Sequence, residues 1–121
     1  MVHIAKMKQT EIFQILSEQL RLRALVLIAS EGELCVCELV HALDTSQPKI
    51  SRHMATMREA GIVVARRHAQ WVFYGLNPSL SPWQHKIVEA TIEGTKTDPV
   101  VKKDTRRLAQ MKNRPERCNV A

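Results

Sequence analysis

Apolar residues in the first half of the chain recur at spacings of three and four positions. This periodicity is typical of helices that bury one face. It predicts three helices, over residues 7–19, 20–30 and 35–43. Gly32 suits the end of the second helix, because glycine tolerates the left-handed backbone that closes many helices.

A fourth helix is predicted to follow the third after the short polar turn formed by residues 44–46. Ser46 is a good N-cap residue, and Pro48 fits the first helical turn, where no hydrogen-bond donor is needed. The helix should run to residue 60 and end at Gly61. Two helices joined by so short a turn form a helix-turn-helix.

Two short runs rich in β-branched and aromatic residues follow, at residues 62–64 and 71–74. The polar link between them favours a β-hairpin, which in this position is a wing. A last helix is predicted over residues 81–93. We therefore expect a mainly α protein with a β-hairpin wing. Its winged helix-turn-helix domain would cover residues 1–94, with a basic, flexible tail over 95–121.

The composition is that of a soluble globular protein. A chain of 121 residues with 45% hydrophobic residues holds one modest core. The longest strongly apolar stretch, residues 25–29, is far shorter than the roughly 20 residues of a membrane span. The N-terminus lacks the layout of a secretory signal. We expect a cytoplasmic protein with no membrane partner.

The charge pattern points to DNA. The net charge is +6, but eight Lys or Arg and three acidic residues lie from Thr95 onward. Residues 46–68 still carry five Lys or Arg and one acidic residue. Gln and Arg can pair with base edges, whereas Lys and Ser suit phosphates. The predicted DNA-binding residues are Ser46, Gln47, Lys49, Ser51, Arg52 and His53 of the fourth helix, and Arg66, Arg67, His68 and Gln70 of the wing.

Cys35 and Cys37 open the third predicted helix. Residues two apart on a regular helix point about 200° apart, so these thiols converge only if the helix begins late. We expect the helix dipole to lower their pKa. Two thiols without a neighbouring His or Asp suit a soft ion, whereas structural zinc needs four ligands. Trivalent arsenic or antimony needs three sulfurs, and Cys118 or a small cellular thiol could supply the third.

No arrangement of residues indicates catalysis. The sequence shows no general-base constellation, no phosphate-binding glycine loop and no nucleophile beside a base. We therefore expect that the protein is not an enzyme.

Three segments resemble the ArsR/SmtB family of metalloregulators, and its arsenic-responsive ArsR branch in particular. They are ELCVCEL at 33–39, ALDTSQPKISRHMATMREAGIV at 42–63 and WVFYGL at 71–76. The resemblance covers about residues 10–95. It implies a dimeric winged helix, with the first and last helices at the dimer interface, that represses its own resistance operon. As(III) or Sb(III) would act as inducer and release the protein from operator DNA, and no cofactor would be required for DNA binding.

By position, Cys35 and Cys37 match the first two inducer ligands of this family. The motif often continues to a third cysteine, and Val40 stands at that place here. Either two thiols suffice, or Cys118 or an external thiol substitutes. Zinc-sensing members use paired ligands on the last helix, whereas His85 and Glu89 are interpreted here as a surface pair.

We hypothesise that ligation distorts the start of the third helix and thereby alters the spacing of the two reading helices in a dimer, about 34–36 Å. Two alternatives remain open. The first is a repressor of the same fold that senses oxidants through a disulfide between Cys35 and Cys37 or Cys118. The second is an arsenic-binding metallochaperone or an arsenic-handling enzyme.

Overall fold

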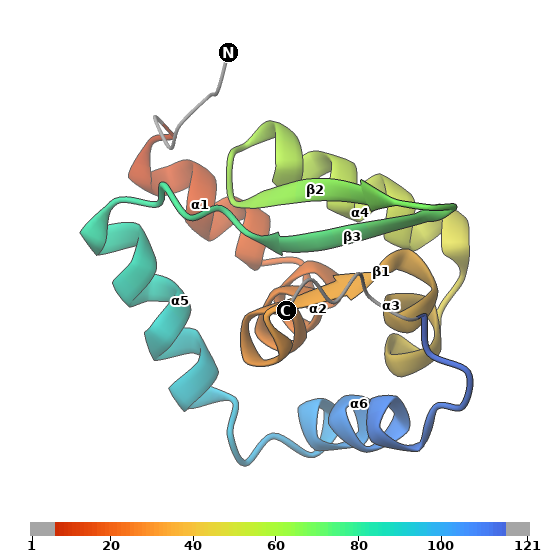
Figure 1. Cartoon of the computed structure of the whole chain (residues 1–121). Helices are drawn as coiled ribbons and strands as arrows, with labels where there is room; N and C mark the ends of the chain where they lie inside the picture. Colours follow the sequence, from red (N-terminus) through yellow and green to blue (C-terminus); the bar gives the residue numbers. More distant parts are fainter. Residues whose placement is uncertain (1–6, 116–121) are drawn as a thin grey trace.

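The computed structural model describes residues 7–115 as helices around a small antiparallel sheet (Figure 1). The helices are α1 (Gln9–Leu16), α2 (Gln19–Glu31), α3 (Val36–Leu43), α4 (Gln47–Glu59), α5 (Pro82–Gly94) and α6 (Pro99–Gln110). The strands are β1 (Glu33–Cys35), β2 (Val63–His68) and β3 (Trp71–Leu76). Helix, turn, helix and hairpin follow one another in the predicted order.

The first five helices lie close to their predicted positions. The first is shorter than expected, because α2 already starts at Gln19, where the Glu18 carboxylate accepts a hydrogen bond of 3.0 Å from the Arg21 N–H. Gly32 has a φ of 94° at the end of α2, the backbone conformation expected of a terminating glycine. Ser46 occupies the N-cap of α4, although its side chain makes no capping hydrogen bond.

The sheet has the order β1-β3-β2, with antiparallel pairing throughout. β2 and β3 form the predicted hairpin, which turns at Ala69 with a φ of 55°. β1 was not predicted. It is only three residues long, and Cys35 pairs with Phe73 in its register. The hairpin is therefore joined through its β3 strand to the segment that carries the first cysteine.

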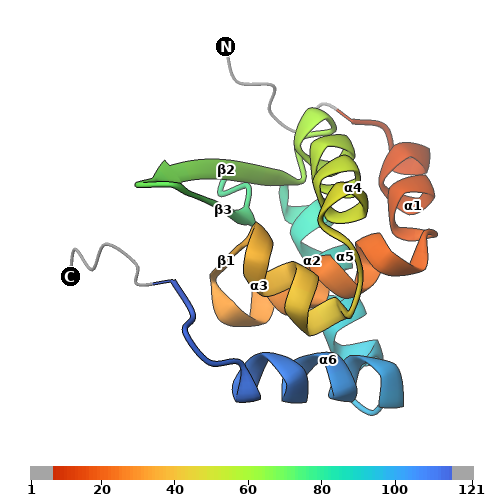
Figure 2. The same cartoon turned by 90° about the vertical axis from the view of Figure 1, so that its right-hand side faces the viewer.

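The core lies between α2, α3, α4 and the inner face of the sheet. α2 runs through the centre, and its residues 24–28 are all buried. Figure 2 shows α3 beside α4, with the hairpin projecting from the body of the molecule. The largest fully buried side chains of the core include Leu25, Ile28, Leu39, Ile50, Met54, Met57 and Phe73. The core thus fixes the helix-turn-helix and leaves the hairpin free to project.

α6 contradicts the predicted flexible tail over residues 99–110. This helix packs on α2 and α3 and runs below α3 in Figure 2. Leu108 and Asp104 are buried, and Asp104 accepts hydrogen bonds from Arg23 at 2.9 and 2.7 Å. The many charged residues of this segment indicated a solvated tail. They did not reveal that Asp104 is buried and has an arginine partner, Arg23, far away in sequence.

None of the helices within residues 7–115 is long and apolar enough to cross a membrane.

Candidate thiol site and nucleic-acid interface

Cys35 and Cys37 lie together where β1 passes into α3. Cys35 is the N-cap residue, with the extended backbone angles φ −86° and ψ 163°, and α3 starts one residue later. The helix thus begins late enough for the two thiols to line one cavity, where Cys35 contributes to the pKa of Cys37. Cys35 is buried and Cys37 is partly exposed, so the pair opens to solvent on the Cys37 side.

Glu38 organises the start of α3 beneath the thiols. Its carboxylate oxygen Oε1 accepts a hydrogen bond of 2.8 Å from the Cys35 N–H, and the Cys35 sulfur accepts one from the Glu38 N–H. The Glu38 side chain is fully buried, and its Oε2 accepts a hydrogen bond of 2.6 Å from Nε of Arg114. The buried carboxylate is therefore paired, as burial of a charge requires.

The pKa of Cys37 is raised to about 12, mainly by burial and then by the neighbouring Cys35 thiol and the charge of Glu38. The expected lowering by the helix dipole is wrong for Cys37, because burial outweighs the dipole. Cys37 is therefore a neutral thiol near pH 7. A divalent cation would have to displace its proton, whereas As(OH)₃ exchanges hydroxide for sulfur and releases water. A neutral thiol is suited to the second reaction.

A cavity of about 380 Å³ adjoins the two thiols. It is lined by Cys35, Val36, Cys37, Val40, Gln47, Gln70, Trp71 and Val72. Gln47 is the first residue of α4, and Gln70 lies in the turn of the hairpin. The candidate sensing site therefore shares one cavity with both elements that the sequence assigns to DNA.

The described residues give no second metal site. Residues 7–115 contain no group of three or more His, Cys, Asp or Glu side chains arranged to hold a metal ion. His85 and Glu89 form a surface ion pair at 3.4 Å, in agreement with the interpretation of these residues as a surface pair. Cys118, the third predicted ligand, lies outside the described residues.

Most of the predicted DNA-binding side chains lie on the solvent-exposed surface of α4 and the hairpin. Ser46, Gln47, Lys49, Arg52, Arg66, Arg67 and Gln70 are exposed, and Ser51, His53 and His68 are partly buried. Gln47 donates a hydrogen bond of 2.8 Å to the Ser51 hydroxyl one turn later. The N-terminus of α4 and the hairpin turn therefore present polar and basic groups to the same solvent region.

His53 turns toward α2. Its Nδ1 lies 3.2 Å from Nη1 of Arg21, and its Nε2 lies 4.0 Å from a carboxylate oxygen of Glu18. Burial is the largest cause that lowers the pKa of His53. The ring connects α4 with the N-terminal end of α2, a structural role that the sequence analysis did not assign to it.

Arg66 is also held by the protein. Its guanidinium donates to both carboxylate oxygens of Glu33, one of them at 3.2 Å from Nε, and lies 5.0 Å from the centre of the Phe73 ring. Arg67 points to the other face of β2, because successive strand residues alternate. Arg66 therefore braces the hairpin against β1, whereas Arg67 is exposed on the other face of the strand.

The sequence analysis missed Glu38, Arg114 and Trp71. Glu38 stands three residues after Cys35, a spacing that fits a capping box and could have been noticed. Arg114 approaches the site from 76 residues away in sequence, so no local pattern announces it. Trp71 was assigned only to a strand, and its place in the cavity depends on the pairing of β3 with β1.

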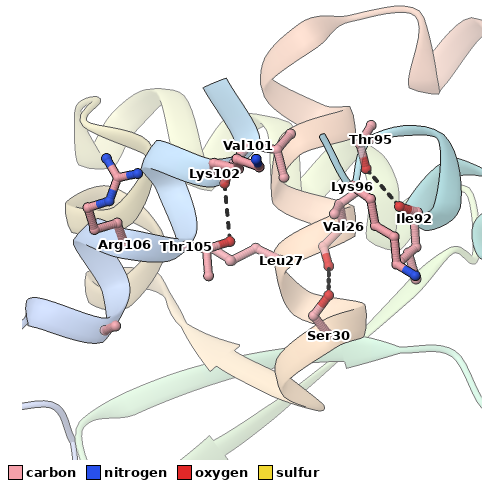
Figure 3. A pocket seen from close by; sticks show the side chains of 11 residues that line it. Val26, Leu27, Ser30, Ile92, Thr95, Lys96, Val101, Lys102, Thr105 and Arg106 are labelled. Carbon is pink, nitrogen blue, oxygen red and sulfur yellow. Dashed lines mark hydrogen bonds between the residues drawn. The ribbon is translucent and has the colours of Figure 1, made fainter. Parts of the chain in front are cut away.

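A second cavity, of about 440 Å³, lies between α2, α5 and α6 (Figure 3). Its walls combine apolar side chains such as Val26 and Ile92 with Lys96 and Arg106. The hydroxyl of Ser30 donates to the Val26 carbonyl oxygen at 2.9 Å, so it is already engaged. No thiol lines this cavity, which therefore offers no site for thiol chemistry.

The comparisons with known proteins place the chain in one family. Residues 18–64 match the family model described as bacterial regulatory protein, arsR family. The chain is 47% identical over 105 residues to the arsenic resistance transcriptional regulator ArsR1 of Pseudomonas putida, covering 87% of this chain and 80% of that protein. It is 46% identical over 110 residues to ArsR2 of the same organism, covering 91% of this chain and 94% of that protein.

The solved structure of HlyU from Vibrio cholerae has the same fold, with a TM-score of 0.64 and 30% identity, covering 73% of this chain and 91% of that one. The fold and the surface groups thus define a winged helix-turn-helix regulator of transcription. The chain belongs to the arsR family of bacterial regulatory proteins. The family and these relatives are regulators, which agrees with the expectation that the chain is not an enzyme.

Proposed function

We propose that this protein is a cytoplasmic repressor that binds operator DNA as a homodimer, without a cofactor, and releases it when As(III) or Sb(III) binds cysteine thiolates. The observation that carries the proposal is the shared cavity, which Cys35 and Cys37 line together with Gln47 of α4 and Gln70 of the hairpin. The names of the two relatives from Pseudomonas putida, arsenic resistance transcriptional regulators, support the choice of arsenic.

Cys35 and Cys37 supply two sulfurs to the inducer, and Cys118 is our candidate for the third. The contact between Arg114 and Glu38 supports this assignment, because Glu38 also binds the Cys35 backbone. From Arg114 to Cys118 the chain spans at most about 14 Å. Its length therefore allows the third sulfur to reach the pair within one protomer.

α4 is the reading helix in this proposal, and the hairpin is the wing. The exposed N-terminus of α4 offers unpaired N–H groups and the positive end of the helix dipole to a phosphate. Arg67 is favoured over Arg66 as the DNA contact of the wing, because the Arg66 guanidinium already donates to the Glu33 carboxylate. The residues proposed to contact DNA are Ser46, Gln47, Lys49, Ser51, Arg52, Arg67, His68 and Gln70.

The proposed dimer forms through α1 and α5, the first helix and the helix predicted from the sequence to be the last. Phe13 of α1 is 58% exposed and Trp83 of α5 is 37% exposed, although both are large apolar side chains. Exposed apolar groups of this size on a soluble protein favour an interface with another protein surface. In Figure 1 both helices lie on the side opposite the tip of the hairpin, so that this contact leaves the reading surface free.

The proposed switch works through the shared cavity. Bridging Cys35 and Cys37 by arsenic ties the N-cap residue of α3 to its first turn and changes the geometry of that turn. Because Gln47 and Gln70 line the same space, this change displaces the start of α4 and the hairpin turn relative to each other. A shift from 99% bound to 99% released requires about 5.5 kcal/mol of differential binding, which two sites in a dimer can share.

The deciding experiment is operator binding by the full, reduced protein, followed by fluorescence anisotropy during titration with arsenite. Wild type should release DNA, and Cys35→Ser and Cys37→Ser should bind DNA but not release it. Release by these two variants at the wild-type arsenite concentration contradicts the proposed site. Release by peroxide but not by arsenite would support the alternative of a thiol-oxidation sensor.

The variant Cys118→Ser, titrated alongside wild type, tests the third ligand. A large rise in the arsenite concentration needed for release assigns Cys118 to the site. Equal release midpoints show that Cys35 and Cys37, with or without an external thiol, suffice.

A further inference from the structure

The three-stranded part of the sheet ends in a row of residues that contains the buried thiol. Cys35, the last residue of β1, pairs with Phe73 of β3, and Phe73 pairs in turn with Arg66 of β2. Residues directly opposite one another in antiparallel strands carry their side chains on the same face. One thiol of the candidate site, a fully buried aromatic ring and an arginine of the hairpin therefore lie side by side across the sheet.

Beyond this row the hairpin has only two strands. The remaining pairs are Arg67 with Val72 and His68 with Trp71, and the turn follows at Ala69. A hairpin of two strands has little stability of its own. The direction of the hairpin tip, which projects from the body of the molecule in Figure 2, therefore depends on how the last three-stranded row is held.

Arg66 spans that row from one edge of the sheet to the other. Its guanidinium lies 5.0 Å from the centre of the Phe73 ring in β3 and donates to both carboxylate oxygens of Glu33 in β1. Glu33 precedes Cys35 by two residues, so the two side chains leave the same face of the strand. The Glu33–Arg66 pair thus ties the hairpin to the strand that ends in the thiol.

We propose that Arg66, held by Glu33, is a positioning residue that transmits inducer binding at Cys35 to the orientation of the hairpin. The inference rests on the proposed function, because it requires that arsenic binds Cys35 and that the hairpin acts as the wing. A displacement of Cys35 moves β1, and the contacts of Arg66 with β1 and β3 carry this movement to β2. Arg66 acts through the direction of the wing and needs no contact with DNA.

The variants separate the Glu33–Arg66 pair from a direct role of the Arg66 charge. Arg66→Lys keeps a positive charge on the hairpin, but an ammonium group lacks the planar fork that binds both oxygens of a carboxylate. Glu33→Gln keeps the length of the partner side chain and removes its charge. The matched controls are Arg67→Lys, on the opposite face of β2, and Glu59→Gln, at an exposed position of α4.

The measured quantity is the ratio of two dissociation constants for operator DNA, one with saturating arsenite and one without arsenite. Fluorescence anisotropy of the full, reduced protein gives both constants. Their ratio is the coupling between inducer and DNA, and it cancels a change in DNA affinity that is equal in both states. Calorimetric titration of each variant with arsenite, without DNA, verifies that the site is saturated.

We expect Arg66→Lys and Glu33→Gln each to reduce this ratio by about fivefold, a modest change because both side chains are partly exposed, at 43% and 30%. Arg67→Lys and Glu59→Gln should keep the wild-type ratio even where they change DNA affinity. The double variant Arg66→Lys/Glu33→Gln should match the single variants, because both substitutions remove the same contact.

A wild-type ratio in either Arg66→Lys or Glu33→Gln would overturn this inference. A double variant whose loss is the product of the two single losses would also overturn it, since the residues would then act separately. Both results leave the proposed function intact as long as arsenite releases wild type and fails to release Cys35→Ser. Release of Cys35→Ser by arsenite would instead overturn the proposed function itself.

Discussion

The two ends of α3 are held in different ways. At its C-terminal end, Arg107 donates to the Ala42 carbonyl oxygen at 2.8 Å and Arg23 donates to the Leu43 carbonyl oxygen at 3.1 Å. Both arginines also bind Asp104, which is 1% exposed. A buried, doubly paired carboxylate thus fixes the end of α3 that leads into the helix-turn-helix turn.

At the N-terminal end, one arginine reaches α3 from outside the domain core. Arg114 binds Glu38 at 2.6 Å, and its side chain remains 31% exposed. Its second partner, Glu31, lies 3.5 Å away near the surface. The end of α3 that carries the thiols is therefore held by one arginine, whereas two arginines hold the other end. The difference indicates that a ligand rearranges the thiol end of α3 more readily than the end that leads into the turn before α4.

The largest expected effect comes from removing the anchor of the C-terminal end. Asp104→Ala should lower the free energy of unfolding by about 3 kcal/mol, because it leaves Arg23 and Arg107 without their shared partner. Urea denaturation of the full protein measures this loss. Lys103→Ala, an exposed neighbour on the same helix, is the control and should change little. A loss below about 1 kcal/mol for Asp104→Ala would contradict the view that Asp104 and its two arginines hold the C-terminal end of α3 firmly.

Glu38→Ala should lower the free energy of unfolding by a smaller amount, about 2 kcal/mol. The Cys35 N–H loses its buried acceptor in this variant, and Arg114 loses its main partner. The same urea experiment applies. Glu31→Ala removes only the distant partner of the same arginine and serves as the matched control. Equal losses in the two variants would show that the buried capping bond adds nothing to the thiol end.

Arg114→Ala should lower the free energy of unfolding by about 1 kcal/mol, less than Glu38→Ala, because the buried Glu38 carboxylate keeps the hydrogen bond from the Cys35 N–H when it loses Arg114. It should nevertheless lower the arsenite concentration at which operator DNA is released, because the thiol end of α3 is then easier to rearrange. Lys112→Ala, an exposed residue two positions earlier, should leave that midpoint unchanged. A destabilisation as large as that of Asp104→Ala would mean that the two ends are held alike.

The smallest expected signal is a proton count at the thiol end. With the pKa of Cys37 raised to about 12, this thiol keeps its proton in the free protein at pH 7. When arsenite binds, the thiol proton leaves together with a hydroxyl group of the arsenite as water. Calorimetric enthalpies of arsenite binding should therefore agree between buffers of different ionisation enthalpy. Cadmium, which must displace the proton, should give enthalpies that depend on the buffer. A buffer-dependent arsenite enthalpy would contradict the neutral thiol.

The helix-turn-helix and the hairpin could be predicted because their signals are local. Apolar periodicity, the Ser46 N-cap position and Pro48 all lie within the elements that they define. β1 was missed because a three-residue strand is too short to show alternation. α6 was misjudged because Asp104, one of its two buried residues, has its arginine partner 81 positions away.

The thiol pair could be identified from the sequence, but its electrostatics could not. Cys35 and Cys37 were recognised by spacing, and the late start of α3 was the stated condition for their convergence. The sign of the pKa change at Cys37 depends on burial, which no spacing reveals. His53 was predicted to bind DNA, but its contacts with Arg21 and Glu18 depend on the packing of α4 against α2, which no local pattern reveals.

The short strand β1 also has a consequence for the speed of the response. Cys35 is 2% exposed and sits at the end of this three-residue strand, so we expect opening of its pairing with Phe73 to widen the access that the cavity gives to its sulfur. Short edge segments open locally far more often than the whole domain unfolds. The rate of induction should then follow fraying of β1, and a protein made more stable elsewhere would respond just as fast.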